Sequence, residues 1–208
     1  MQFKLLVDKL KNSNQEALPA WEAHKLMAPA YRKNFTYEEV TPLNPKKASV
    51  LILLQEKEGS IFFPLILRNS YDGVHSDQVS FPGGKFEEQD KINFVTAKRE
   101  TSEEIGIEVD KMNYVTQLSK LYIPPSNFLV TPFIAFLEKE VNYIKDKREV
   151  KKIIDISLDE ILEDKYETTK TMNLYGLDFE VPIFNFQNLI IWGATAMILS
   201  EFKQVLKN

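Results

Sequence analysis

Two strongly apolar runs place the tightest constraint on the fold of this chain. Residues 50–54 and 61–67 flank the turn-like sequence EKEG, a pattern that is typical of a β-hairpin. Pro64 interrupts the second run, so we expect a sheet edge or a bulge at that point. A short strand near residues 78–81 and a helix over residues 91–105 follow. This part of the chain therefore predicts a sheet that is accompanied by a helix.

The second half of the chain continues with strands. Residues 112–123 and 127–138 are strand-like and are separated by Pro-Pro-Ser, which again favours paired strands. Residues 148–165 predict a strand that runs into a short helix, with Ser157 as its N-cap. Residues 171–186 resemble another hairpin. Strands of this number around a few helices indicate an α+β domain, or an α/β/α layered one.

Amphipathic helices are expected near both ends. Apolar side chains recur at helical spacing first at Phe3, Leu6, Val7 and Leu10, and later at Ile191, Thr195, Ile198, Phe202 and Val205. A polar stretch with several prolines follows the first of these helices and predicts an extended arm. We therefore expect residues 1–46 to form an N-terminal helix and arm that pack on a main domain of residues 47–208.

The composition is that of a globular protein and excludes several functions. With 208 residues and a hydrophobic share of 44%, the chain can bury a sizeable core. Its net charge of -4 is spread along the chain, so a broad basic surface for nucleic acid is not expected. The absence of cysteine excludes disulfides, thiolate metal sites and thiol nucleophiles. Asp8 and several lysines interrupt the first apolar stretch, and no run approaches a membrane span, so we expect a soluble cytoplasmic protein without membrane contacts.

Three carboxylates crowd the helix predicted over residues 91–105. At roughly 100° per residue, Glu100 and Glu104 lie beside its apolar face, and Glu103 lies about a quarter turn further round. Repulsive, partly desolvated carboxylates suit a hard divalent cation such as Mg²⁺ or Mn²⁺. Arg99 is placed to pair with Glu103 at i,i+4. The alternative interpretation is a solvated acidic helix face.

The residues before this helix favour the metal site. The sequence FPGGK contains adjacent glycines, which allow backbone carbonyls to approach a ligand. Asp90 stands where an N-cap is needed. We expect a rigid Pro-Gly-Gly turn, a short loop and a carboxylate-lined helix to form together a site for a metal ion and a diphosphate.

Residues 84–107 closely resemble the Nudix box, whose pattern is G-x5-E-x7-R-E-U-x-E-E-x-G-U, where U is apolar. The signature positions are filled by Gly84, Arg99, Glu100, Glu103, Glu104, Gly106 and Ile107. Asp90 takes the place of the first Glu, the gap to Arg99 is one residue longer, and Thr101 occupies the first U. The resemblance implies a Nudix-type α/β/α sandwich with a mixed sheet, a catalytic loop–helix–loop and a C-terminal helix.

The same resemblance implies roles for these residues. Glu100 and Glu104 would be the main ligands of Mg²⁺ or Mn²⁺, and Glu103 would contribute directly or through water. The Gly84 carbonyl would add a further ligand, and Arg99 would orient the carboxylates. The metal would activate water for attack on a diphosphate.

Nudix enzymes often draw one more acid from a distant loop. Glu149 is our candidate for this catalytic carboxylate. The alternative is that the sequence DKREVKK around it forms a charged surface connection.

Upstream of the box the sequence is similar to coenzyme A pyrophosphatase-like Nudix proteins. Their pattern L-L-T-x-R-S-x3-R-x3-G-x3-F-P-G-G is kept at Arg68, Phe81, Pro82, Gly83 and Gly84. It is altered at Asn69 in place of Ser, Gly73 in place of the second Arg, and Asp77 in place of Gly. Residues 124–137, 149–162 and 191–202 also resemble segments of that subfamily.

This similarity implies a substrate. Coenzyme A or a derivative would be split into 3′,5′-ADP and 4′-phosphopantetheine, with substrate contacts expected from Arg68, His75, Phe81 and Gly83. His75 has the alternative of a structural hydrogen bond within its loop. Because Gly73 removes a guanidinium suited to the 3′-phosphate, Arg68, Lys46 or Lys47 would have to compensate.

Other functions stay open, because the fold and the box do not select the substrate. One alternative is hydrolysis of ADP-ribose, a dinucleotide or a damaged nucleotide. Another is a Nudix-like ligand-binding or regulatory domain without catalysis. A homodimer is compatible with the sequence, although no particular residue specifies one.

Overall fold

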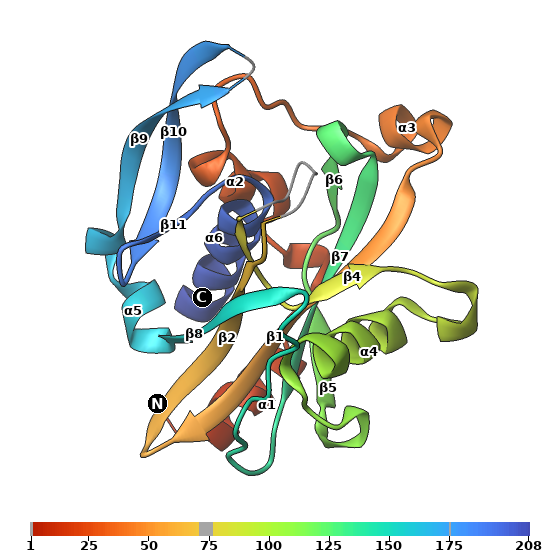
Figure 1. Ribbon diagram of the computed structural model, residues 1–208, viewed down its shortest axis with the longest axis vertical. Coiled ribbons are helices and arrows are strands. Elements are labelled where there is room, and N and C mark those ends of the chain that lie inside the picture. Colours follow the sequence, from red (N-terminus) through yellow and green to blue (C-terminus); the bar gives the residue numbers. More distant parts are fainter. Residues whose placement is uncertain (1, 71–76, 175) are drawn as a thin grey trace.

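A mixed β-sheet forms the centre of the computed structural model, which describes residues 2–70, 77–174 and 176–208 (Figure 1). Its strands are β1 (Lys46–Lys57), β2 (Ser60–Arg68), β3 (Val79–Ser80), β4 (Gly83–Lys85), β5 (Asn113–Gln117), β6 (Leu121–Ile123), β7 (Phe128–Phe136) and β8 (Val150–Ser157). They follow the order β3-β2-β1-β7-β5, while β4 pairs with β1, β6 with β7, and β8 with β2. Only the pairing of β1 with β7 is parallel among the strand pairs in this part of the chain.

Helices lie on both faces of the sheet. The helices of the chain are α1 (Phe3–Lys11), α2 (Ala20–His24), α3 (Tyr37–Val40), α4 (Asn93–Ile105), α5 (Leu158–Leu162) and α6 (Gly193–Lys207), of which α4 packs on one face and α1 and α6 on the other. Leu51 and Leu53 of β1 belong to the apolar cluster that includes residues of α4. The alternate residues Ile52 and Leu54 belong to the cluster that includes α1 and α6. Because successive strand residues point to opposite faces, these two clusters confirm the predicted α/β/α layering.

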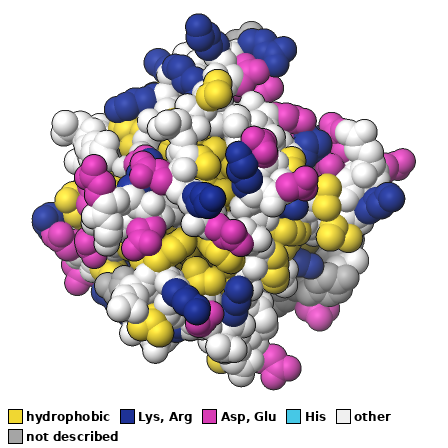
Figure 2. Space-filling model, turned by 90° about the horizontal axis from the view of Figure 1, so that it is seen from below, with side chains coloured by type: hydrophobic (Ala, Val, Ile, Leu, Met, Phe, Trp, Pro, Cys, Tyr) yellow, Lys and Arg dark blue, Asp and Glu magenta, His cyan; other side chains and the backbone are white. Residues whose placement is uncertain are grey.

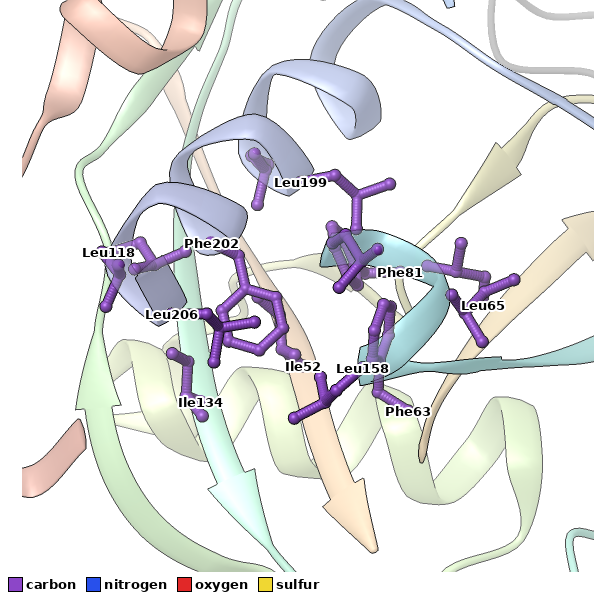
Figure 3. Packing of buried hydrophobic residues seen from close by; sticks show 14 of the residues in the cluster. Ile52, Phe63, Leu65, Phe81, Leu118, Ile134, Leu158, Leu199, Phe202 and Leu206 are labelled. Carbon is purple, nitrogen blue, oxygen red and sulfur yellow. The ribbon is translucent and has the colours of Figure 1, made fainter. Parts of the chain in front are cut away.

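The larger cluster packs α6 against the sheet. Phe202, Leu199 and Leu206 of α6 lie over Ile52 and Ile134, and Figure 3 shows these side chains converging. The closing helix was predicted to include Ile191, but that residue ends strand β11 (Leu189–Ile191), and the helix begins at Gly193.

The N-terminal segment contributes to the same cluster. α1 buries Leu6, Val7 and Leu10, as predicted. The expectation of an extended arm is wrong, because α2 and α3 interrupt it. Ser200 of α6 donates a hydrogen bond to the carbonyl of Ala23 at 2.7 Å, which ties α2 to α6. The division into an arm of residues 1–46 and a domain of residues 47–208 stays a prediction.

The predicted hairpin is formed by β1 and β2. Glu58 and Gly59 make its turn and both have positive φ, as a two-residue type I′ turn requires. Pro64 lies opposite Asp155 of β8, between the pairings of β2 with β1 and with β3. In the described pairings Pro64 has a neighbouring strand on one side only, which fits the sheet edge that we predicted there, whereas the bulge lies between Leu67 and Arg68.

A second, three-stranded sheet precedes α6. It consists of β9 (Glu167–Leu174), β10 (Leu177–Phe186) and β11, in the order β11-β10-β9. The pairing of β9 with β10 confirms the hairpin predicted over residues 171–186. Ser157 is the N-cap of α5, as predicted, and it forms a capping box with Glu160.

The surface carries charges of both signs. On the face shown in Figure 2, Lys and Arg side chains are interspersed with Asp and Glu side chains. In the described ranges, none of the helices combines the length and the apolar composition that a membrane span needs.

Candidate functional site

Helix α4 carries the three predicted carboxylates. It ends as expected at Gly106, which has φ of 73° in the left-handed region. Our prediction that Asp90 caps the helix is wrong: the N-cap position is Ile92, and Asp90 ends the 3₁₀ helix Glu88–Asp90. The Asp90 carboxylate instead accepts a hydrogen bond from the Thr96 hydroxyl at 2.9 Å. Asp90 is therefore held against the side of α4.

Arg99 joins the acidic groups of this region. Its Nε donates to Oδ1 of Asp90 at 2.9 Å, and its Nη2 donates to Oδ2 at 3.1 Å. Nη1 contacts Glu103 at 3.1 Å, as the i,i+4 spacing predicts, and Nη2 lies 3.0 Å from Oε1 of Glu100. Nη2 also donates to the carbonyl of Lys85 at 3.2 Å. Hydrogen bonds from Arg99 lower the pKa of Asp90 to about 2.

The three carboxylates differ in exposure in the way that the helical spacing predicts. The side chain of Glu104 is 1% exposed and that of Glu100 is 16% exposed, whereas Glu103 is 58% exposed. Glu100 and Glu104 are thus largely withdrawn from water, and Glu103 is not.

The adjacent glycines bring backbone against the buried Glu104 and the half-buried Glu100. Gly83 and Gly84 belong to strand β4 and pair with β1, so the expected Pro-Gly-Gly turn is wrong. The N–H of Gly83 donates to Oε2 of Glu104 at 2.8 Å. A Cβ on Gly83 would lie 2.3 Å from the Ser49 carbonyl oxygen, and one on Gly84 would lie 2.3 Å from Oε2 of Glu100. Only glycine permits this close approach at either position.

Arg68 reaches the same place from the end of β2. Its Nη2 lies 3.3 Å from Oε1 of Glu104 and donates to the Gly83 carbonyl at 3.0 Å. Its Nε donates to the Ser80 hydroxyl at 3.2 Å. Despite the nearby guanidinium, Oε1 of Glu104 is buried without a hydrogen-bond partner. A buried carboxylate oxygen in that state favours a further positive ligand.

Burial changes the acidity of both carboxylates. It raises the pKa of Glu104 to about 8, although the charge of Arg68 and the hydrogen bond from Gly83 act in the opposite direction. Burial also raises the pKa of Glu100, and this effect is opposed by Arg99. Without a further cation, negative charge on these two groups is therefore costly.

Glu149 lies within electrostatic reach of this pair. Its charge adds, after larger contributions, to the raised pKa of both Glu100 and Glu104. The structure thus brings Glu149, from the loop before β8, to the same region as the helix carboxylates. Its carbonyl accepts a hydrogen bond from the N–H of Asn69 at 3.0 Å.

Residues 45–172 match the model of the NUDIX domain family. The chain belongs to this family. The match covers the strands β1 to β8 and helix α4, so it contains the whole region around Glu100, Glu104 and Gly84. Nudix hydrolases act with divalent metal ions on small-molecule diphosphates.

Curated relatives support the family. Nudix hydrolase 15, mitochondrial, from Arabidopsis thaliana is 34% identical over 176 residues, which cover 78% of this chain and 61% of the relative. The chain thus spans less than two thirds of that protein. Peroxisomal coenzyme A diphosphatase NUDT7 from Mus musculus is 28% identical over 173 residues, which cover 80% of this chain and 73% of the relative.

A solved structure supports the fold. The Nudix hydrolase RenU from M. smegmatis superposes with a TM-score of 0.55 at 12% identity, over 87% of this chain and 93% of that one. At this identity the likeness concerns the Nudix fold and not the substrate.

The Nudix carboxylates do not form a complete metal cluster by themselves. Within residues 2–70, 77–174 and 176–208, no three Asp, Glu or His side chains converge closely enough to hold an ion. Arg99 lies between Glu100 and Glu103, and Arg68 pairs with Glu104. The donor set still fits a divalent cation, because Glu104 keeps an unpartnered oxygen and Glu100 lies against the Gly84 backbone.

The remaining predicted contacts are distributed differently. The side chain of Phe81 is 1% exposed and packs 6.1 Å from the Phe63 ring, inside the cluster of Figure 3. Our prediction that the Phe81 side chain contacts the substrate is therefore wrong, because the ring is part of the apolar core. Lys46 and Lys47 lie over the rings of Phe128 and Phe86. Gly73 and His75 lie outside the described residues.

Two departures from the subfamily pattern have structural partners that the sequence did not indicate. Asn69 donates from its side-chain amide to the carbonyls of Lys147 and Arg148. Asp77 accepts from Ser70 and pairs with Lys151 at 3.1 Å. The carbonyl partners of Asn69 lie more than seventy residues away in the sequence, and so does Lys151 from Asp77. No sequence signal therefore predicted these contacts.

Proposed function

We propose that this protein is a metal-dependent pyrophosphohydrolase that splits a nucleoside diphosphate linked to another moiety. The observation that carries this proposal is the pair of desolvated carboxylates, Glu100 and Glu104, held against the backbone of Gly83 and Gly84. Burial raises the pKa of both groups, and the charge of Glu100 raises that of Glu104 further. A divalent ion on this pair accounts for the arrangement.

The ion that we propose is Mg²⁺ or Mn²⁺, since carboxylate and carbonyl oxygens are the ligands that these ions prefer. Glu100, Glu104 and the carbonyl of Gly84 would hold it, with Glu103 contributing directly or through water. A bound ion of this kind supplies neutralisation of the diphosphate oxygens and a water of lowered pKa. Arg99 fixes the orientation of Glu100 and Glu103 by its four-point contact with the acidic groups.

We propose Glu149, whose charge acts on both Glu100 and Glu104, as a further carboxylate of the site. In the proposed reaction it is a group that can accept a proton in the hydrolytic step, because it is exposed and does not pair with Arg68 or Arg99 in the described contacts. Arg68 lies beside Glu104 with its side chain 23% exposed, and we propose that it contacts a phosphate of the substrate.

The substrate that we propose is coenzyme A or one of its derivatives, with 3′,5′-ADP and 4′-phosphopantetheine as products. Two observations support this choice: the Arg68 and FPGG positions upstream of α4, and the 28% identity to the mouse coenzyme A diphosphatase. A cytoplasmic location and a homodimer stay predictions, and the relatives include a mitochondrial and a peroxisomal protein.

The experiment is a chromatographic product analysis with coenzyme A, ADP-ribose and dinucleotides, with Mg²⁺, Mn²⁺ or a chelator. We expect coenzyme A to be cleaved, cleavage to stop in chelator and to return with metal, and thiol-alkylating reagents to have no effect. The matched variants are Glu104→Gln, expected to be inactive, and Glu108→Gln on the exposed surface after α4, expected to be active. Cleavage of ADP-ribose alone would show that ADP-ribose, and not coenzyme A, is the substrate. If no compound is cleaved, the result would indicate a ligand-binding Nudix domain.

A further inference from the structure

Asn69 makes an unusual set of contacts with the loop before β8. Its side-chain Nδ2 donates to the carbonyl of Lys147 at 2.9 Å and to that of Arg148 at 2.7 Å. Its backbone N–H donates to the carbonyl of Glu149 at 3.0 Å. One residue thus satisfies three consecutive carbonyl oxygens, and the last of them belongs to Glu149.

The chemistry of the amide makes this possible. An Asn side chain has two N–H donors on one nitrogen, whereas a Ser side chain has one O–H donor. The coenzyme A pyrophosphatase-like pattern has Ser at this position, so this chain has gained a donor. A serine here could bond at most one of the two carbonyls that the Asn69 side chain reaches.

The other side of the same loop is attached to α4. The N–H of Asp146 donates to the carbonyl of Glu104 at 3.0 Å, and the N–H of Ile144 donates to that of Ile105 at 2.9 Å. The loop is therefore held between the end of α4 and the end of β2. Glu149 is the last residue of this loop before β8 begins.

A β-bulge lies directly beyond Glu149. Leu67 pairs with Lys152, but Arg68 pairs with Val150, so Lys151 is an extra residue in β8. Because an inserted residue changes the phase of the side chains, a bulge re-aims the residues before it. Lys151 turns towards Asp77, with 3.1 Å between Nζ and Oδ1. The position of Glu149 thus depends on the pairing at the end of β2.

We propose that Asn69 is a positioning residue that sets the carboxylate of Glu149 relative to Glu104. This inference rests on the proposed hydrolytic function, in which Glu149 takes part. Glu149 is exposed, so its own side chain is not confined by packing, and its backbone is the part that the fold can fix. Asn69 holds the backbone of residues 147–149 with three hydrogen bonds, one of which reaches Glu149 itself. Asp146 connects the same loop to Glu104, which carries the other carboxylate.

The test is a double-mutant cycle on coenzyme A hydrolysis with Asn69→Asp and Glu149→Gln. Asp has the shape of Asn but replaces both N–H donors by acceptors that face two carbonyls. We expect Asn69→Asp to lower kcat by about tenfold to a hundredfold, as a misplaced catalytic group does, with KM within about twofold of the wild type. In the Glu149→Gln background the same substitution should change kcat by less than about twofold. Equal losses in both backgrounds would overturn the proposal.

Two further variants complete the test. Asn69→Ser keeps one side-chain donor, so we expect a loss of kcat between those of the wild type and Asn69→Asp. If Asn69→Asp does not fold, Asn69→Ser takes its place in the double-mutant cycle. Asn113→Asp is the matched control, since the Asn113 amide makes a single bond to Lys111 at 3.2 Å on β5. Its kcat should equal that of the wild type.

Hydrogen exchange measures the attachment without reference to activity. We expect the amides of residues 146–150 to exchange faster in Asn69→Asp than in the wild type. In Asn113→Asp they should exchange at the wild-type rate. Unchanged exchange would overturn the attachment whatever the kinetics. If the wild type hydrolyses no diphosphate, the proposed function fails and the positioning role of Asn69 in catalysis fails with it. Faster exchange in Asn69→Asp would then still support the attachment of the loop.

Discussion

The backbone of Gly84 touches the carboxylate of Glu100 so closely that no side chain fits between them. A Cβ on Gly84 would lie 2.3 Å from Oε2 and 2.4 Å from Cδ of Glu100. Contacts of this length do not occur, so any larger residue must displace the carboxylate. The requirement for glycine at this position therefore comes from the partner on α4 and not from a left-handed backbone.

We predict that Gly84→Ala lowers kcat/KM by at least about a hundredfold, because the added methyl group displaces the Glu100 carboxylate from its place in the proposed metal site. The thermal midpoint of unfolding should fall by only a few degrees, since the flexible side chain of Glu100 can move. Steady-state kinetics and a thermal melt test this. Gly59→Ala is the control: its added Cβ would meet no atom within 4 Å, so it should alter turn stability and leave kcat/KM unchanged. Wild-type kcat/KM in Gly84→Ala would show that Glu100 need not lie where it does.

Glu104 gives the metal-free protein a characteristic dependence on pH. Burial raises its folded-state pKa from 4.5 to about 8. Between these values the folded state holds a proton that the unfolded state has lost, so the free energy of unfolding falls as pH rises. Glu104→Gln should remove this loss and be more stable than the wild type at pH 8 in chelator, while its turnover drops by orders of magnitude.

Urea denaturation at pH 5 and pH 8 in the presence of a chelator measures this effect. Glu103→Gln is the comparison variant, because its side chain is exposed on the same helix. We expect that variant to keep the pH dependence of the wild type. A Glu104→Gln protein that still loses stability between pH 5 and pH 8 to the same extent would contradict the assignment.

Asp90 has the opposite pH dependence. Hydrogen bonds from Arg99 lower its folded-state pKa from 3.8 to about 2. The stabilisation is therefore complete above pH 3.8 and is lost as pH falls towards 2. We predict that Asp90→Asn costs on the order of 2 kcal/mol at pH 7 and almost nothing near pH 2. Chemical denaturation at the two pH values tests this, and the exposed Asp110→Asn should show neither effect.

The contrast between Asp90 and Glu104 shows what the sequence could predict. The order of carboxylates around α4 follows from the helical period alone, and it matched their exposure. The strands and the terminal helix likewise follow from apolar periodicity. The partner of Asp90 did not follow, because an acidic residue before a helix is usually a cap, and a guanidinium nine residues later competes for it only in the folded chain.

Phe81 and Asn69 illustrate the same limit. Phe81 belongs to a conspicuous motif beside the site, yet its ring turns into the core against Phe63. Asn69 looked like a departure from a pattern, yet it bonds carbonyls 78 and 79 residues away. Local patterns specify which face of an element is apolar. They do not specify which distant backbone groups need a donor.

A buried polar group away from the site should affect stability alone. Glu201 of α6 is fully buried and lies 2.9 Å from Nε2 of His24, and its carboxylate also accepts from the N–H groups of Ala20 and Ser119. We predict that Glu201→Ala destabilises the fold by roughly 1–3 kcal/mol, because these donors lose their acceptor. Denaturant titration measures this. kcat/KM at a temperature well below the transition should stay within about twofold of the wild type, and Glu22→Ala on the exposed side of α2 should be neutral.

The last prediction concerns the 3′-phosphate of coenzyme A. Gly73 stands where coenzyme A pyrophosphatase-like proteins have Arg, so this chain lacks one guanidinium that suits a phosphate. A lost charge-assisted contact is worth roughly 1.5–3 kcal/mol, or about ten- to over a hundredfold in specificity. We therefore expect kcat/KM for coenzyme A and for dephospho-coenzyme A to be similar in the wild type. Gly73→Arg should raise the ratio in favour of coenzyme A, while Gly73→Gln, which is long but uncharged, should not. A strong preference for coenzyme A in the wild type would mean that another cation, with Arg68 as the first to test, already binds the 3′-phosphate.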